Sequence, residues 1–377
     1  MTTFNSHAGS FRDPAGFIFN YKDSLYRQIN HAGKADYDFF ISSGLYDSLI
    51  KEGLIIEHQE VKNPPGAPRS NLRYKIIKPE QIPFISYPYE WSFSQLNTAA
   101  LLTLKIQEIA LKHGMILKDA SAYNVQFVGQ RPVFIDTLSF RIYKSGAPWD
   151  GYKQFCQHFI SPLALSAYYS PEIIKTLRVF LDGIPLSLAS RMLPSRSRAR
   201  LGIMAHIHLH AASQKRYEKA NLNAERKTRS VSPTAMSGLL SSLRRSVMSI
   251  KMPKQKTEWG EYYGNTNYSK SSFTQKQKIV SELLSNISPK PKTVWDFGAN
   301  DATFSEIAAG SGAYTVAFDI DHQAVESGLN GLKNQKYENR ILLLVQDFSN
   351  PSPSLGWAHK ERASLEARGP SDAALAL

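Results

Sequence analysis

One stretch near the C-terminus, residues 293–321, constrains the fold of this chain more than any other. It reads TVWDFGANDATFSEIAAGSGAYTVAFDID: an apolar strand, a tight turn at Gly298, a helix that begins near Thr303, and a second apolar strand ending in acids. A glycine lets a ligand approach the backbone at such a turn, and the first amides of the following helix point toward that ligand. This order of elements is typical of half of a nucleotide-binding α/β domain.

The acidic residues of this stretch indicate the chemistry of the ligand. Asp319 ends the second strand about twenty residues after the turn, where a carboxylate accepts hydrogen bonds from ribose hydroxyls. We therefore expect a ligand that carries a sugar. Asp296 and Asp301 would repel a pyrophosphate, because like charges repel. They would attract S-adenosylmethionine, which has no phosphate and carries a sulfonium and an ammonium group.

With these residues the segment resembles the class I S-adenosylmethionine-dependent methyltransferases, and the resemblance implies a Rossmann-like domain. It also implies the cofactor contacts. Asp319 would bind the ribose hydroxyls, Asp347 after the third predicted strand at 341–345 would bind the adenine amino group, and Phe348 would lie on the adenine face. The cofactor-binding set that follows from the resemblance is Asp296, Gly298, Asn300, Asp319, Asp347 and Phe348.

Flanking motifs look more narrowly like the nodulation-protein (NoeA-like) methyltransferases. These are the segment 259–262, Tyr268, and the proline-containing segments 350–353 and 369–372. Residues 372–377 are predicted to form the fourth strand, and because the chain stops inside it we expect a truncated domain. In the family that the segment resembles, the acceptor-side motif follows the fourth strand. Neither the methyl acceptor nor a catalytic residue is therefore identified.

A second motif lies between Ser92 and Phe140. Asp119 and Asn124 are followed by a predicted hairpin and then by Asp136. This order resembles the catalytic loop and metal-binding acid of protein-kinase-like folds, with Asp119 as the base and Asn124 and Asp136 as Mg²⁺ ligands. No glycine-rich phosphate loop precedes the motif, and Lys75 or Lys78 is the candidate phosphate-pairing lysine. The alternative is structural, with these polar side chains capping turns.

Length and charge suggest how the chain is divided. With 377 residues it is long enough for about two or three domains. We predict an α+β, kinase-like domain at 1–190, a basic linker at 191–256 and the Rossmann-like domain at 257–377. The single Cys156 excludes an intrachain disulfide, and the sequence shows neither a secretory signal nor an apolar run that spans a membrane. We therefore expect a cytoplasmic protein.

The basic linker leaves two interpretations open. Much of the net charge of +13 lies between Arg191 and Lys256. The linker is predicted to be a mobile connector containing an amphipathic helix, whose apolar residues are Leu239, Leu240, Leu243, Val247 and Ile250. That helix either packs on the neighbouring domain or binds an anionic membrane or nucleic acid. The functions considered are thus a methyltransferase, a kinase-like phosphotransferase, and a nonenzymatic basic binding module.

The periodicity also predicts individual elements in the first half of the chain. We expect a hairpin at 11–19, a helix at 37–52, a loop at 63–68, a strand at 73–77 and a helix at 93–113. His206, His208 and His210 alternate as on a strand. No cysteine or acid near them completes a set of metal ligands, so we expect no metal site there.

Overall fold

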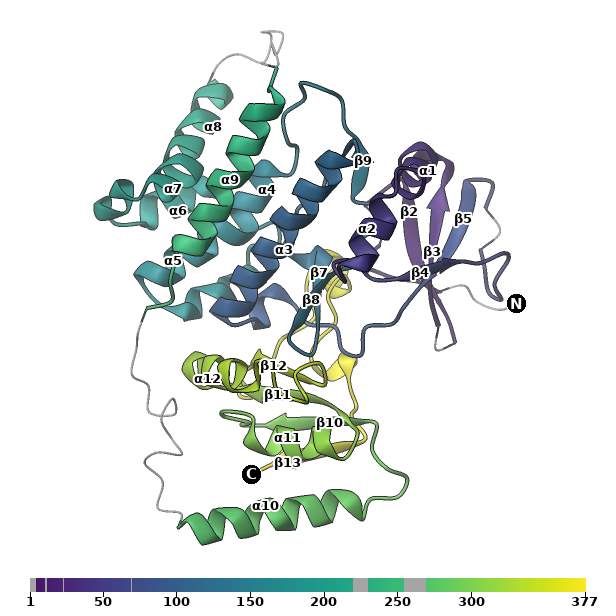
Figure 1. Ribbon diagram of the computed structural model, residues 1–377, viewed down its shortest axis with the longest axis vertical. Coiled ribbons are helices and arrows are strands. Elements are labelled where there is room, and N and C mark those ends of the chain that lie inside the picture. The colour runs from purple at the N-terminus through teal and green to yellow at the C-terminus, as the bar shows by residue number, and fades with distance from the viewer. Residues whose placement is uncertain (1–4, 11, 23, 69, 220–229, 254–268) are drawn as a thin grey trace.

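The computed structural model describes residues 5–10, 12–22, 24–68, 70–219, 230–253 and 269–377. Figure 1 shows an antiparallel sheet at the N-terminal end, a central helical region and a parallel sheet at the C-terminal end. The described structure is therefore mixed α/β, as the sequence predicts. No helix within these residues combines the length and hydropathy needed to cross a lipid bilayer.

The N-terminal sheet has five strands in the order β1-β2-β3-β5-β4. Their bounds are β1 Asn5–Ser6, β2 Gly16–Tyr21, β3 Ser24–Asn30, β4 His58–Glu60 and β5 Arg73–Pro79. The strand predicted at 73–77 is confirmed as β5. The hairpin predicted at 11–19 has the wrong bounds. Its Pro14 turn lies in the connection between the antiparallel strands β1 and β2, and a second hairpin pairs β2 with β3 and turns at Lys22, whose φ is 50°.

Two short helices follow β3 where the sequence predicts one. α1 spans Lys34–Ser42 and α2 spans Leu45–Lys51. Gly44 separates them with a left-handed φ of 74°, a conformation that interrupts a helix and that glycine adopts without steric cost. The predicted helix at 37–52 is therefore correct in content but divided in the middle.

The central region is built around α3, Phe93–Lys112, which confirms the predicted helix. Ser92 and Gln95 form a reciprocal capping box at its start, and Gly114 follows its end with a φ of 72°. Two short antiparallel pairs follow, β6 Met115–Leu117 with β9 Phe140–Ile142, and β7 Val125–Val128 with β8 Arg131–Phe134. The remaining helices include α4 Tyr152–Phe155, α5 Ser161–Tyr168, η5 Pro171–Arg178, α6 Leu186–Met192, α7 Leu201–Ile203, α8 His210–Lys219 and α9 Pro233–Ser249.

The predicted mobile linker at 191–256 is folded wherever it is described. α9 packs on α3, and its residues Leu240, Leu243 and Val247 are buried in the main core. The Asn97 side chain donates to the carbonyl of Val247 at 3.0 Å, and Arg244 pairs with Glu108. The apolar face of this helix therefore covers a neighbouring part of the chain, because burial there removes its apolar side chains from water.

The histidines of this region lie on helical backbone, so the predicted strand is wrong. The run Met204–Leu209 is a π-helix that continues into α8. His206 contacts Tyr152 and Ser242 through its two ring nitrogens, and His208 contacts Ser190 and Ser197. Both rings are thus buried with hydroxyl partners, and alternate spacing in the sequence does not reflect strand geometry here.

The C-terminal sheet is parallel, with strands in the order β12-β11-β10-β13. The strands are β10 Thr293–Phe297, β11 Tyr314–Asp319, β12 Ile341–Val345 and β13 Ala373–Ala376, so all four predicted strands are confirmed. Helices α10 Lys270–Ser285, α11 Thr303–Gly310 and α12 His322–Leu332 pack against one set of strand side chains, which includes Val294, Ala317 and Leu343, and so cover one face of the sheet. The alternation of side chains along each strand sends every second residue to the other face.

That other face packs on the N-terminal and central regions. Val316, Phe318, Leu342 and Leu344 belong to the same buried core as α3 and α9. The Gln95 side chain donates to the carbonyl of Leu343 at 2.9 Å, which ties the start of α3 to β12. The boundaries predicted at residues 190 and 256 therefore do not separate independent cores.

A buried ion pair joins the segment after β12 to the first half of the chain. The Arg368 guanidinium donates to both carboxylate oxygens of Glu90, with one contact at 2.9 Å. The two side chains are only 6% and 1% exposed. Arg368 also lies over the rings of Phe84 and Tyr87. Glu90 in turn accepts from the Tyr87 amide, so its carboxylate has three donor contacts.

We expect Arg368→Ala to lower the free energy of unfolding by roughly 3 to 5 kcal/mol, because it leaves the buried Glu90 charge without its cation. Urea unfolding of the full chain measures the change. Lys278→Ala is the matched control, since its partner Glu282 is exposed and the loss there should stay below about 1 kcal/mol. Equal losses in the two variants would contradict a stabilising role for the buried pair.

Candidate functional site

The carboxyl ends of β10, β11 and β12 meet at one edge of the parallel sheet. The turn after β10 holds Gly298, Asn300 and Ala302, all with positive φ, at 71°, 50° and 71°. Gly298 is exposed, and no atom lies within 4 Å of the position that a Cβ would take. The turn therefore offers an open approach to its backbone, as the sequence predicts for a ligand-binding loop.

Asp319 fastens this turn to the end of β11. One carboxylate oxygen accepts from the Asn300 amide at 2.9 Å and the other from the Asp321 amide at 2.8 Å. Burial raises the pKa of Asp319, and the hydrogen bonds from Asp321 and Asn300 only partly offset that rise. Each carboxylate oxygen has two lone pairs, so these bonds leave acceptor capacity for the hydroxyls of a ligand.

Asp296 lies beneath the turn and not on its surface. It is 1% exposed and accepts from the Ser305 hydroxyl at 2.6 Å, which ties β10 to α11. Burial raises its pKa to about 6; the Ser305 bond opposes the rise and the charge of Asp319 adds to it. The sequence does not predict this contact, which Ser305 makes from the first turn of α11.

Asp347 and Phe348 stand at the same edge after β12. Asp347 accepts from the Ser349 amide at 2.8 Å and from its hydroxyl at 2.6 Å, and these bonds lower its pKa. Phe348 is 42% exposed and meets Phe297 and Phe318 edge-on, with ring centroids 4.6 and 5.5 Å away. The sequence did not single out this aromatic cluster, because its members come from three separate strand ends.

The central region lies against this edge of the sheet. Arg178 of η5 donates to the carbonyl of Asn350 and to the hydroxyl of Ser352, at 3.4 and 3.2 Å. Glu172 of the same helix lies 3.6 Å from the buried His322, at the start of α12. Residues far away in the sequence thus border the strand ends, which no local pattern could indicate.

The second motif also assembles in space. The Asn124 side-chain amide donates to the carbonyl of Asp119 at 3.5 Å and to the Ser139 hydroxyl at 3.2 Å, and Ser139 donates to Asp136 at 2.7 Å. Burial raises the pKa of Asp119, and the nearby charge of Asp136 adds to that effect. Asp119 and Asn124, which follow β6, and Asp136, which follows β8, therefore form one polar cluster.

The cation of this cluster comes from β3. Arg27 forms an ion pair with Asp136, and both side chains are largely buried. Burial alone would raise the pKa of Asp136, but Arg27 and the bonds from Ser139 and Leu138 outweigh it and lower the pKa. Lys75 pairs instead with Glu60, and Lys78 lies over Tyr26. The cation that pairs with Asp136 is thus Arg27, which carries no local signal. The phosphate-pairing role of Lys75 or Lys78 stays a prediction.

The donor set of the cluster suits a hard divalent cation. Two carboxylates and an amide supply oxygen atoms, the ligand type that Mg²⁺ prefers. Arg27 already balances part of this negative charge, so Asp136 would have to share its oxygens between the guanidinium and a metal. Within the residues that the structure describes, no group of three or more His, Cys, Asp and Glu side chains is placed to hold a metal ion.

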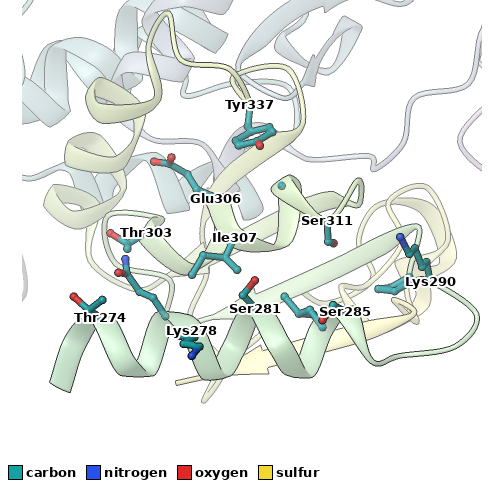
Figure 2. A pocket seen from close by; sticks show the side chains of 14 residues that line it. Thr274, Lys278, Ser281, Ser285, Lys290, Thr303, Glu306, Ile307, Ser311 and Tyr337 are labelled. Carbon is teal, nitrogen blue, oxygen red and sulfur yellow. The ribbon is translucent and has the colours of Figure 1, made fainter. Parts of the chain in front are cut away.

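A separate cleft of about 860 Å³ lies between α10, α11 and Tyr337 (Figure 2). Hydroxyl and amide groups line much of it, together with Lys278, Lys290 and Glu306. Among the cofactor-binding residues that the sequence predicts, none contributes to its lining. The cleft lies on the helix-covered side of the sheet, so it is distinct from the edge described above.

Comparison with known proteins gives a relative over nearly the whole chain. The chain is 32% identical over 375 residues to nodulation protein NoeA of Rhizobium meliloti (strain 1021), covering 98% of this chain and 77% of that protein. Among solved structures, it is similar to the kinase of the Cydia pomonella granulovirus with a TM-score of 0.30 and 10% identity, over 65% of this chain and 93% of the kinase. No protein-family model matches the chain.

The raised pKa of Asp296 predicts a pH dependence of stability. Because the folded-state pKa of about 6 lies above the ordinary 3.8, the folded state binds more protons between these values. Stability contributed by this group is then lost as pH rises through that window, by about 3 kcal/mol. Urea unfolding should be compared for the wild type and Asp296→Asn across this pH range. The free energies of unfolding of the two proteins should differ most near pH 6 and above, and should converge as pH falls toward 3.8. Parallel curves would contradict the assignment.

Proposed function

The chain belongs to the family of the nodulation protein NoeA, and we propose that it acts as an S-adenosylmethionine-dependent methyltransferase on an unidentified acceptor. The observation that carries this proposal is the strand-end edge of the parallel sheet. At this edge the glycine turn follows β10, Asp319 ends β11, and Asp347 and Phe348 follow β12. These three strands are hydrogen-bonded neighbours in the sheet, so their carboxyl ends lie side by side. Ligands of open α/β sheets bind at this edge.

The residues present fit the parts of this cofactor. The space above Gly298 accepts a group close to the backbone, and the remaining lone pairs of Asp319 suit two ribose hydroxyls. Asp347 is in reach of solvent and supplies an acceptor for an amino group, and Phe348 offers a ring face for stacking. Asp296 supports the turn from below and does not contact the ligand in this proposal.

Methyl transfer from a sulfonium requires little acid–base catalysis by the protein. The cofactor, when bound, supplies a methyl group activated by its sulfonium. The chain's own part is to hold cofactor and acceptor in line and to exclude water from between them. Asp319 and Asp347 would fix the adenosyl end of the cofactor. The rest of the cofactor would then lie over Gly298, and its position there would determine where the acceptor must bind. We assign no catalytic base.

Titration calorimetry of the full chain with S-adenosylmethionine tests the proposal. We expect Asp319→Ala to weaken binding by roughly 1.5 to 3 kcal/mol, the scale of hydrogen bonds to a charged group. Phe348→Ala should cost about 1 to 3 kcal/mol through lost stacking on the adenine ring. The second variant matters because Phe348 is exposed, so its loss does not disturb the turn as loss of Asp319 does.

Asp182→Ala is the matched control for this titration, since Asp182 is almost fully exposed and lies in the central region. It should leave cofactor affinity unchanged. Wild-type protein that does not bind S-adenosylmethionine would refute the proposed function. Binding that survives both Asp319→Ala and Phe348→Ala unchanged would refute the assigned site.

A second candidate function, kinase-like phosphotransfer, is favoured by the cluster of Asp119, Asn124, Asp136 and Arg27. In this candidate Asn124 and Asp136 would hold a divalent cation on a nucleotide, and Asp119 would accept the proton of a hydroxyl. Arg27, which pairs with Asp136, would balance the negative charge of that carboxylate and of a phosphate bound beside it. The convergence of these side chains from β3, the loop after β6 and the loop after β8 is what supports it.

Calorimetric titration with Mg-ATP tests this candidate. We expect binding to the wild type, and Asp136→Asn should weaken it at least about tenfold, because one anionic metal ligand is lost. Asp182→Asn serves as the control for a change at an exposed carboxylate. No Mg-ATP binding would refute this candidate, as would a loss that follows Asp319→Ala and not Asp136→Asn.

A further inference from the structure

Two basic segments that are far apart in the sequence meet at one end of the central region. Arg200 donates to the carbonyl of Ser249 at 3.4 Å. Gly202 lies so close to α9 that a Cβ on it would be 2.1 Å from the Ser246 hydroxyl. The end of the first segment, residues 200–202, therefore lies beside residues 246–249 of the second. Figure 1 shows α6, α7 and α8 gathered on the side of the molecule opposite the N-terminal sheet.

We name the exposed side chains of these two segments the arginine face. It has six cations and three apolar side chains, which are Arg191, Met192, Arg196, Arg198, Arg200, Leu201, Arg245, Met248 and Lys251. The sequence from residue 186 to 253 contains only two acids, Glu218 and Glu225. Among the described residues, no ion pair involves any of the six cations.

Part of the arginine face is held in place by aromatic contacts. The guanidinium groups of Arg196 and Arg200 lie over the ring of Tyr168, at 5.5 and 5.9 Å from its centroid. Tyr169 donates from its hydroxyl to the carbonyl of Met192. These contacts hold residues 192–200 against the end of α5, and Arg191 and Arg198 are exposed beside them, so the face is positioned without acidic partners.

The apolar side chains of the face decide between partners. Leu201 is 86% exposed, Met248 55% and Met192 42%. A nucleic acid bound through its phosphates satisfies the arginines but leaves the apolar groups in water unless they reach the bases. An anionic bilayer offers charge at its surface and hydrocarbon just beneath, so it satisfies both kinds of side chain.

From this arrangement we propose that the arginine face binds the surface of an anionic lipid membrane. The guanidinium and ammonium groups contact lipid phosphates, and Leu201 and Met248 enter the boundary between headgroups and acyl chains. The contact is peripheral and depends on ionic strength, because it rests on charges that salt screens. It differs from the predicted role of α9, whose apolar face is already buried on α3.

Co-sedimentation of the full chain with vesicles tests the proposal. Vesicles of equal parts phosphatidylglycerol and phosphatidylcholine should bind the protein at physiological ionic strength, and pure phosphatidylcholine vesicles should not. Arg198→Glu/Arg245→Glu should weaken binding at least about tenfold. Leu201→Gln leaves the net charge unchanged and should weaken it at least about threefold, through the lost apolar contact.

The matched control is Lys333→Glu/Lys360→Glu, which makes the same change in net charge at exposed lysines of the C-terminal domain. It should weaken binding less than about threefold. Three results would overturn the proposal: no binding of the wild type to the anionic vesicles; an equal loss in the control; or binding to duplex DNA that falls in the arginine variant while Leu201→Gln affects neither DNA nor vesicles.

Discussion

The structure depends on how the two apolar faces of the parallel sheet are covered. A parallel sheet buries both faces, and helices usually cover each. Here α10, α11 and α12 cover one face, and the N-terminal and central regions cover the other through Val316, Phe318 and Leu342. The buried pair of Arg368 and Glu90 lies at this junction, where desolvated charges require a fixed geometry. The sheet therefore has a complete core only in the presence of the first half of the chain.

This junction also brings the surroundings of the two candidate centres together. Arg12, in the loop between β1 and β2, donates to Glu361 at 2.8 and 3.1 Å. Arg362 lies over the ring of Tyr123, 4.2 Å from its centroid, and Tyr123 immediately precedes Asn124. The segment after β12 thus contacts a residue that is next in sequence to the polar cluster of the central region.

The carboxylates of the molecule illustrate three ways of burying negative charge. Asp296 takes a single hydroxyl donor and has a strongly raised pKa, so its charge is disfavoured. Asp319 is held by two backbone amides, which orient it at the end of β11. Asp136 is paired with Arg27 and stays ionised. Of these, the amide-held Asp319 combines a defined orientation with remaining acceptor capacity, which is what a ligand-binding carboxylate needs.

The sequence by itself determined the elements whose signals are local. The four strands of the parallel sheet, the glycine turn and α3 follow from apolar runs, glycine positions and helical spacing of apolar residues, which act over a few residues. Tertiary structure decided the rest. It folded the predicted linker onto α3, divided the helix at Gly44, paired Arg27 with Asp136, and gathered Phe297, Phe318 and Phe348 at one edge. Those outcomes depend on which surfaces exclude water from one another and which charges must pair when buried, and such pairings join residues that no sequence window contains.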